Sequence, residues 1–361
     1  MSTQLESEPC KTKTLNDQLF HEIKEKIERY FTRNKIKRTG NVSLYLKGAF
    51  FLSMTMALYF TMLFCPLPLW ALAIVSGALG ISFAGIGFNI MHDSGHGSFS
   101  SNKWLNILGG YTLNLMGGNI FLWKNKHNVN HHNYTNIKGM DEDIDIEPFI
   151  RTHASQPRHW YHRYQHIYSA FLYGIVHLNW VLYSDFRKYF LRKVSETEMK
   201  KIPIKEHIIF WASKAVHFSL FLVLPMVMLG VWKALFMYFV VSFVCGVILG
   251  TTFQLAHVVQ NVEFPKLTDV RTKTKNNWAL YQIKTTVNFA TKNRFVFWFT
   301  GGLNFQLVHH LFPKISHVHF PVINKLIRET CAKFDIRYME YPTCWSALRS
   351  HFSYLKCMGV S

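Results

Sequence analysis

The chain has 361 residues, of which 49% are hydrophobic, 16% aromatic and 17% charged, and its formal net charge is +19. This apolar content exceeds what one small soluble domain needs, so we expect a membrane protein. The positive charge follows the flanks of apolar runs without a nucleic-acid recognition motif, which argues against nucleic acid as a partner and favours anionic membrane lipid or an acidic protein.

Residues 1–43 predict a basic N-terminal segment that stays in the cytoplasm. The first twenty residues lack the apolar core of a cleaved signal. Between Lys24 and Lys47 lie eight Lys or Arg residues, whereas the turns expected on the far side of the membrane offer only Lys233. Because cytoplasmic flanks carry the excess of positive charge, the N-terminus is expected there.

The first long apolar stretch predicts two membrane spans. From Gly48 to Met91 there is no Asp, Glu, Lys or Arg, and one helix of that length would be about twice as long as the hydrocarbon layer is thick. Pro66 and Pro68 interrupt the stretch near its middle, and proline ends one helix and can begin the next. We therefore predict a hairpin of spans 45–64 and 68–91.

A second hairpin is predicted from spans 208–229 and 231–255. These runs are broken at Gly230 and carry only Lys214 and Lys233 as charges. Two weaker apolar stretches, Trp104 to Trp123 and Ile167 to Phe186, are interrupted by polar residues and glycines. We expect both to form helices lying in the membrane interface.

This topology predicts an all-α integral membrane protein with four transmembrane helices in two hairpins, interfacial helices and a cytoplasmic helical cap. Regions 92–206 and 256–342 then lie on the cytoplasmic side and would form the cap that carries a metal site. Residues 343–361 are expected as a cytoplasmic C-terminal tail, so both termini share that side with the site.

Three histidine clusters are expected on the cytoplasmic side. We name them the first box (His92–His96, HDSGH), the second box (His127–His132, HNVNHH) and the third box (Gln306–His310, QLVHH); His257 stands alone at the end of the fourth span. Residues four apart share one helix face, so His92 with His96, and His127 with His131, can each approach a single metal. His132 is turned about 100° further, so one helix can serve two metals, as can adjacent His309 and His310. Imidazole suits iron, zinc, copper and nickel, so the residue type alone does not select the metal.

Other histidines are expected to be structural. His162 and His166 repeat the four-residue spacing, but they lie among aromatic and basic residues that are typical of a membrane interface. His317 and His319 are treated in the same way. Asp93, inside the first box, could orient a ligand imidazole or cap the end of the second span.

An acidic run, Asp141-Glu142-Asp143-Ile144-Asp145, follows the second box. It is most simply a solvated loop, and the alternative is a clamp for the basic surface around Arg151 and Arg158.

From about Tyr45 to Pro342 the chain resembles the membrane fatty-acid desaturase family. The resemblance rests on the two hairpins and on the motifs HDSGH, WKNKHNVNHHNYTN, LAHVVQN and FQLVHHLFP. It implies a desaturase domain at 44–342 with a non-haem di-iron site, dioxygen as co-substrate and an acyl tunnel. Carried over position by position, the implied iron ligands are His92, His96, His127, His131, His132, His309 and His310. His257 matches an additional family histidine, and an interface histidine is its alternative.

Gln306 stands where many family members have histidine. Glutamine there resembles the front-end branch, whose members add a double bond between an existing one and the carboxyl end. The usual eukaryotic front-end enzymes carry an N-terminal cytochrome b5 domain, whose HPGG signature this chain lacks. The resemblance therefore implies a separate electron donor, ferredoxin or cytochrome b5, and the missing domain weakens the front-end assignment. Gln306 could bind iron directly, hold a bound water, or orient His310.

The implied function is an oxygen-dependent oxidoreductase that inserts a cis double bond into a fatty acyl chain, carried by coenzyme A or by a lipid. Trp123, Trp278, Gln282 and Thr286 could shape the substrate entrance or pack at the headgroup level. A fatty acyl hydroxylase of the same family is one alternative. A His-rich membrane metal transporter is another, but a transporter should place its ligands in mid-membrane.

Overall fold

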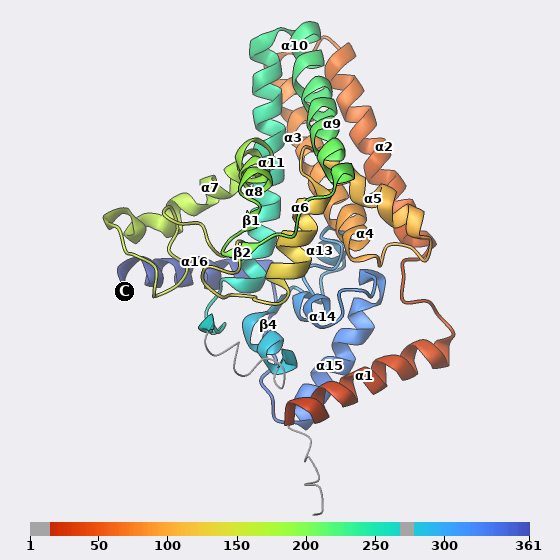
Figure 1. Cartoon of the computed structure of the whole chain (residues 1–361), viewed down its shortest axis with the longest axis vertical. Helices are drawn as coiled ribbons and strands as arrows, with labels where there is room; N and C mark the ends of the chain where they lie inside the picture. The colour runs from red at the N-terminus through yellow and green to blue at the C-terminus, as the bar shows by residue number, and fades with distance from the viewer. Residues whose placement is uncertain (1–14, 268–277) are drawn as a thin grey trace, which may run out of the picture.

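The computed structural model describes residues 15–267 and 278–361, and it is mostly helical (Figure 1). Long helices form a bundle at one end of the molecule, and shorter helices gather at the other end. Within the described residues, four continuous helical stretches are long and apolar enough to cross a membrane: Val42–Phe64, Leu69–His96, Ile204–Leu229 and Val231–His257. They match the four predicted spans, although the second continues through the first box.

The breaks between these helices fall where the sequence places them. Helix α2 (Val42–Phe64) ends before the two prolines, and Pro68 occupies the N-cap of α3 (Leu69–Ile86). Proline suits this position because it lacks the N–H that a helix start leaves unpaired. Gly230 separates α10 (Leu224–Leu229) from α11 (Val231–His257) with a φ of +85°, which a residue without a β-carbon adopts at little cost.

Two of the long stretches contain π-helical turns. The second continues from α3 through η1 (Gly87–Met91) into α4 (His92–His96), and the third consists of α9 (Ile204–Phe218), η5 (Ser219–Val223) and α10. Such turns are rare and are frequent at functional sites. Here η1 directly precedes the first box, so it sets the direction in which His92 and His96 point.

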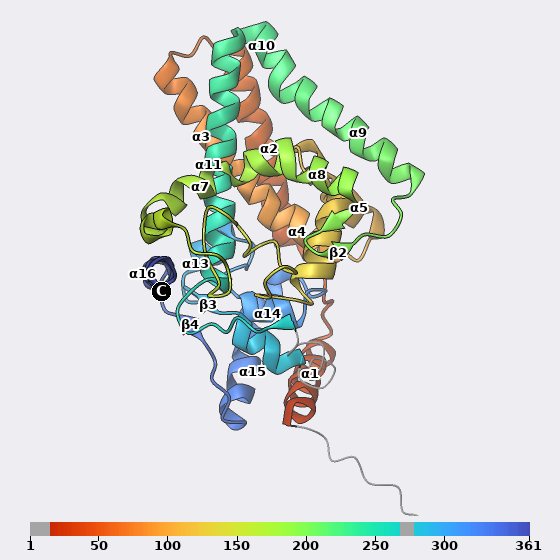
Figure 2. The same ribbon diagram turned by 60° about the vertical axis from the view of Figure 1, so that its left-hand side comes forward.

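Helix α11 is central to the bundle and packs against α3 and against α7 (Gln165–Asn179). The contact with α7 is close, since a β-carbon added at Gly246 would lie 2.5 Å from the carbonyl oxygen of Gly174. Helix α9 diverges from the other long helices toward its N-terminal end (Figure 2).

The two weaker apolar stretches form short helices. The first contains α5 (Lys103–Leu115) and α6 (Ile120–Lys124), and the second is covered by α7, η4 (Trp180–Ser184) and α8 (Asp185–Leu191). None of them is among the helices long enough to span. Large apolar side chains such as Trp104, Leu108 and Ile167 are exposed on them.

The end remote from α10 is built from helices of both chain termini (Figure 1). Helix α1 (Leu15–Asn34) packs against α15 (Phe320–Lys333), and their apolar faces share one core with α14 (Gln306–Leu311). The expected C-terminal tail forms α16 (Cys344–Val360), whose Leu355 and His351 are buried. Helices α1 and α16 are therefore packed parts of the structure.

The remaining elements are short: η2 (Asn125–His131), η3 (Trp160–Tyr164), α13 (Arg294–Phe299), η6 (His317–His319), β1 (Lys193–Val194), β2 (Thr197–Glu198), β3 (Asn288–Phe289) and β4 (Glu340–Tyr341). Strands β1 and β2 pair antiparallel, and β3 and β4 pair parallel. The strictly all-α expectation missed these pairs, because two-residue strands carry no periodic signal and β3 pairs with a strand far along the chain.

Candidate metal centre

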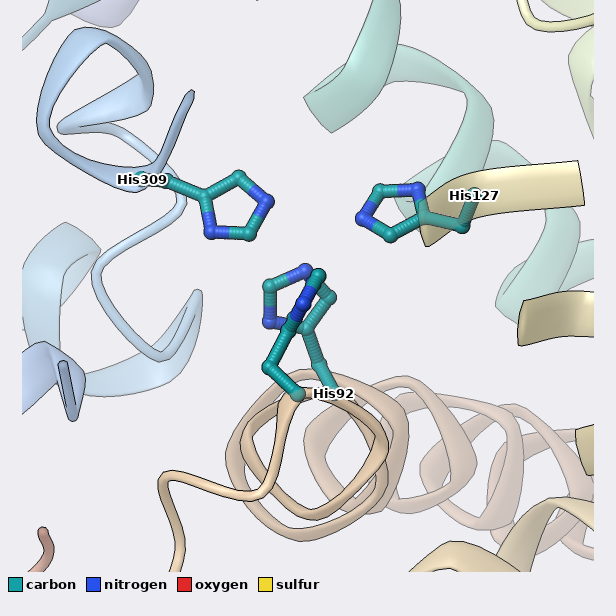
Figure 3. A group of neighbouring side chains, drawn as sticks. His92, His127 and His309 are labelled. Carbon is teal, nitrogen blue, oxygen red and sulfur yellow. The ribbon is translucent and has the colours of Figure 1, made fainter. Parts of the chain in front are cut away.

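The first box lies on α4, at the end of the second long helical stretch. His92 and His96 are one turn apart, with ring centroids 4.8 Å from each other. His127 and His309 approach from other segments, and the rings of His92, His127 and His309 face a common space (Figure 3). One nitrogen from each of His92, His96, His127 and His309 lies within 4.8 Å of the others, which is close enough to hold a metal ion.

A second group is formed by His131, His257 and His310, whose nitrogens also lie within 4.8 Å of one another. All three side chains are buried. His132 lies between the two groups, with its ring centroid 4.6 Å from those of His309 and His310. The structure therefore brings together all eight histidines that the sequence analysis selected.

The second box differs from the helical geometry that its spacing predicts. His127 and His131 were expected to approach one metal, and one candidate grouping contains both with Asp143, whereas the two groups made of histidines alone divide them. The box lies on the π-helix η2, where the N–H of His132 donates to the carbonyl of His127 five residues earlier. A π turn needs more residues than an α turn, yet the rings of His127 and His131 still stack, with centroids 5.2 Å apart and planes 21° apart.

Asp141 holds His131 in one orientation. Its carboxylate is fully buried and accepts a hydrogen bond from His131 Nδ1, which lies 3.0 Å from Oδ1 and 3.1 Å from Oδ2. The same carboxylate accepts from the backbone N–H groups of Asn136 and Asp143. With Nδ1 protonated toward Asp141, Nε2 of His131 keeps its lone pair for a metal.

The acidic run is therefore not a solvated loop, and the alternative clamp on Arg151 is not formed either. Asp143 pairs with Lys126 at 2.6 Å, and Glu142 pairs with the buried Lys188 at 2.8 Å. Arg151 instead donates to backbone carbonyls, including that of Gln156. The sequence analysis missed Asp141 as a site residue, although its place soon after the second box was an available signal.

Amide side chains support the second group of histidines. Gln306 Nε2 lies 3.0 Å from His257 Nε2 and 3.2 Å from His310 Nε2, so Gln306 touches the metal-facing nitrogens directly. Gln282 Oε1 accepts from His310 Nδ1 at 2.8 Å, and its amide donates to the carbonyl of His132. Gln282 thus orients a candidate ligand, whereas it was expected at a substrate entrance.

Asp93 neither caps its helix nor bonds a ligand imidazole. Its Oδ2 accepts from Ser316 Oγ at 2.8 Å and from His317 Nδ1 at 3.0 Å, while its Oδ1 stays 4.0 Å from His92 Nδ1. His317 Nε2 in turn lies 2.9 Å from Lys47 Nζ. This buried network ties the first box to the segment that follows the third box.

The remaining selected residues take other places. Trp123 stacks on His127, with ring centroids 4.5 Å apart and planes 21° apart. Thr286 Oγ1 donates to the carbonyl of Gln282, and Trp278 contacts Phe20 of α1. His162 Nε2 donates to the carbonyl of Pro148, and His162 Nδ1 accepts from the backbone N–H of His159, in line with its expected structural role.

The electrostatics of the centre favour neutral imidazoles. Burial, with the neighbouring histidines, holds the pKa values of His127, His132, His309 and His310 well below the usual range. For His131, burial acts in the same direction, but the carboxylates of Asp141 and Asp143 outweigh it and raise the pKa. Buried nitrogens of His92, His96, His127, His132 and His309 have no hydrogen-bond partner. Neutral imidazoles with free lone pairs are what a divalent metal requires.

Comparisons with known proteins agree on one family. Residues 30–342 match the family model described as fatty acid desaturase. The chain is 36% identical to an acyl-lipid (8-3)-desaturase of Physcomitrium patens over 96% of this chain and 72% of that protein. It is 34% identical to an sn-1 linoleoyl-lipid 6-desaturase of Arthrospira platensis over 94% of this chain and 92% of that protein. It is also 31% identical to an acyl-lipid (8-3)-desaturase of Mortierella alpina, over 95% and 78% respectively.

Proposed function

Because the chain belongs to the fatty acid desaturase family, we propose that it forms a cis double bond in the acyl chain of a membrane lipid. Membership makes it an oxidoreductase that acts on acyl substrates in membranes. The lipid-bound substrate is inferred from the names of its relatives, which are acyl-lipid and linoleoyl-lipid desaturases. The observation that carries the proposal is the convergence of eight histidines from distant parts of the chain, seven of them buried and His96 half-buried.

We propose that these histidines hold two iron ions. His92, His96, His127 and His309 would face one ion, and His131, His257 and His310 the other, with His132 between them. The fit rests on this structure, because the imidazole nitrogens converge. Five of the eight histidines have a buried nitrogen without a protein partner: His92, His96, His127, His132 and His309. Imidazole-rich sites also suit zinc, copper and nickel, so the choice of iron rests on the family.

The bound irons would supply the dioxygen-dependent removal of two hydrogens from an unactivated carbon–carbon bond. The residues of this chain position the ligands and exclude water. Asp141 fixes the tautomer of His131, and Gln282 fixes that of His310. Trp123 covers one face of His127 and is itself buried, so it keeps water from that side. Gln306 contacts His257 and His310, so its amide is placed to reach a bound metal directly or through a water.

Front-end regiochemistry is proposed for the same reaction. Gln306 opens the third box, as in the front-end branch. A relative is named a 6-desaturase of linoleoyl lipid, and the double bonds of a linoleoyl chain lie on the methyl side of that position. The new double bond is thus proposed between an existing one and the carboxyl end.

We further propose a multi-pass topology with the site and both described terminal helices in the cytoplasm. Four apolar helices are available to span, and positive charges concentrate near the first span on the side where the boxes lie. Exposed apolar side chains on α5 and α7 fit helices that lie in the interface. Electrons are proposed to come from a separate donor, ferredoxin or cytochrome b5.

The proposal is tested by expressing the chain in a host with defined lipids and locating new double bonds by mass spectrometry. We expect a new double bond on the carboxyl side of an existing one, in lipid-bound chains. His131→Ala should abolish the product and lower the iron content, while the matched control His162→Ala should retain both. A hydroxylated product with no new double bond would refute the reaction, and equal iron retention in both variants would refute the ligand assignment.

A further inference from the structure

The segment after the third box connects the buried histidines to the surface by a short path. His310 is fully buried on α14, which ends at Leu311. Phe312 follows and is half-buried, and Lys314 is exposed. The covalent chain therefore runs from a candidate iron ligand to the surface within a few residues.

Three aromatic side chains meet at this point. Phe312 stacks on Phe20 of α1, with ring centroids 5.9 Å apart and planes 25° apart, and Phe20 meets Trp278 edge to face at 5.3 Å. All three are half-buried. We call Phe20, Trp278 and Phe312 the aromatic patch. Half-buried aromatic side chains in contact with one another are typical of the central part of a protein interface.

Positive charge surrounds the aromatic patch. Lys24 lies over the ring of Phe20, with Nζ 4.3 Å from its centroid. Lys24 and Lys314 are both exposed, and neither forms an ion pair with another described residue. Acidic side chains of α1 are already paired: Glu22 with Lys26 at 3.0 Å and Lys333 at 2.7 Å, and Glu25 with Arg29 at 3.4 Å. The free charge beside the patch is therefore positive.

Membrane lipid does not explain this charge. Helices α1 and α15 lie at the end of the molecule opposite α10, and the apolar helices that could cross a membrane occupy the other end (Figures 1 and 2). A bilayer around those helices would leave the aromatic patch in the aqueous phase. Half-buried aromatic rings, with the unpaired Lys24 over one of them and the unpaired Lys314 two residues after Phe312, fit a protein with an acidic surface.

We infer that the aromatic patch, with Lys24 and Lys314, is the docking surface for an acidic one-electron carrier protein, and that electrons enter the centre through Phe312. This inference rests on the proposed function, which requires an external donor. Each double bond removes two hydrogens from the acyl chain, and two carrier electrons with two protons from water complete the reduction of dioxygen to two waters. Each carrier is oxidised by one electron, so two docking events serve one turnover.

The test compares two reductants on the purified full-length protein in liposomes. Reduced ferredoxin and the soluble haem domain of cytochrome b5 are titrated separately as carriers. Dithionite, applied without dioxygen and removed before dioxygen is admitted, serves as a reductant that needs no docking. For the double variant Lys24→Glu/Lys314→Glu we expect KM for the effective carrier to rise about 10-fold or more, because attraction becomes repulsion. Its salt dependence should weaken, and the dithionite-driven yield of product should be unchanged. Phe312→Leu should slow carrier-driven reduction even at saturating carrier, and should also raise KM because Phe312 belongs to the docking surface.

The control is Lys356→Glu, an exposed lysine on α16, remote from the patch. An unchanged KM in the double variant would overturn the inference. An equal rise of KM in the control would also overturn it, because the effect would then reflect net charge alone. Weaker association of the double variant with anionic liposomes at unchanged KM would overturn it too, because the lysines would then bind lipid. If no reductant yields a double bond even with the unaltered protein, the proposed function fails instead.

Discussion

Asp141→Asn is the most direct test of how the second group of histidines is held. The substitution preserves volume but removes the charge from a fully buried carboxylate that accepts from His131 Nδ1 and from two backbone N–H groups. An amide has one oxygen, so it cannot satisfy all three donors, and its own N–H groups would face one of them. His131 would lose its fixed tautomer while its backbone position stays the same.

The magnitude follows from the hydrogen bond that is lost. A buried hydrogen bond to a charged group contributes about 1.5–3 kcal/mol. Replacing the outer partner of a ligand histidine typically lowers metal affinity by about 10–100-fold, which corresponds to about 1.4–2.8 kcal/mol. The two ranges agree, so we expect iron affinity at the His131 position to fall by one to two orders of magnitude.

The assay is iron content per protein after dialysis against a graded chelator series, with circular dichroism to check the fold. Asp145→Asn is the matched control, since Asp145 belongs to the same acidic run but contacts Gln156 and no histidine. We expect the control to follow the unaltered protein. If Asp141→Asn keeps unaltered iron affinity, the role assigned to Asp141 is wrong.

Three further predictions concern stability. The pKa of His351 is lowered to about 4 by burial, so its stabilising effect is complete above its ordinary value near 6.5 and is lost as pH falls from there toward 4. We expect the free energy of unfolding to fall by on the order of 3 kcal/mol over this range. The melting temperature should fall with it, and should fall less in His351→Gln. Lys214→Met should destabilise by about 3–5 kcal/mol because it strands the buried Asp185, its partner at 3.1 Å, and pairing it with Asp185→Leu should restore much of the loss in a double-mutant cycle. Gly246→Val should separate α7 from α11, because its side chain meets the backbone of α7. It should lower the melting temperature in detergent more than the control Gly77→Ala, whose added β-carbon would lie 3.9 Å from its nearest neighbour.

The sequence by itself determined the four apolar helices, their breaks and the identity of the converging histidines. The length of an apolar run, and the helix breaks at Pro68 and Gly230, depend on the local sequence. They can therefore be predicted without knowing which residues pack against them. The order of the boxes along the chain is evident from the sequence, and all eight histidines do meet.

Only the tertiary structure decided how those histidines are divided and supported. The rings of His127 and His131 stack, but the two groups made of histidines alone divide them, and the spacing of the residues does not predict this division. The burial of Asp141 and the contact between Gln282 and His310 join residues far apart in sequence. A run of carboxylates stays solvated unless cations or hydrogen-bond donors face it. Here the partners are Lys126, Lys188 and His131, and only the folded chain brings them to the carboxylates.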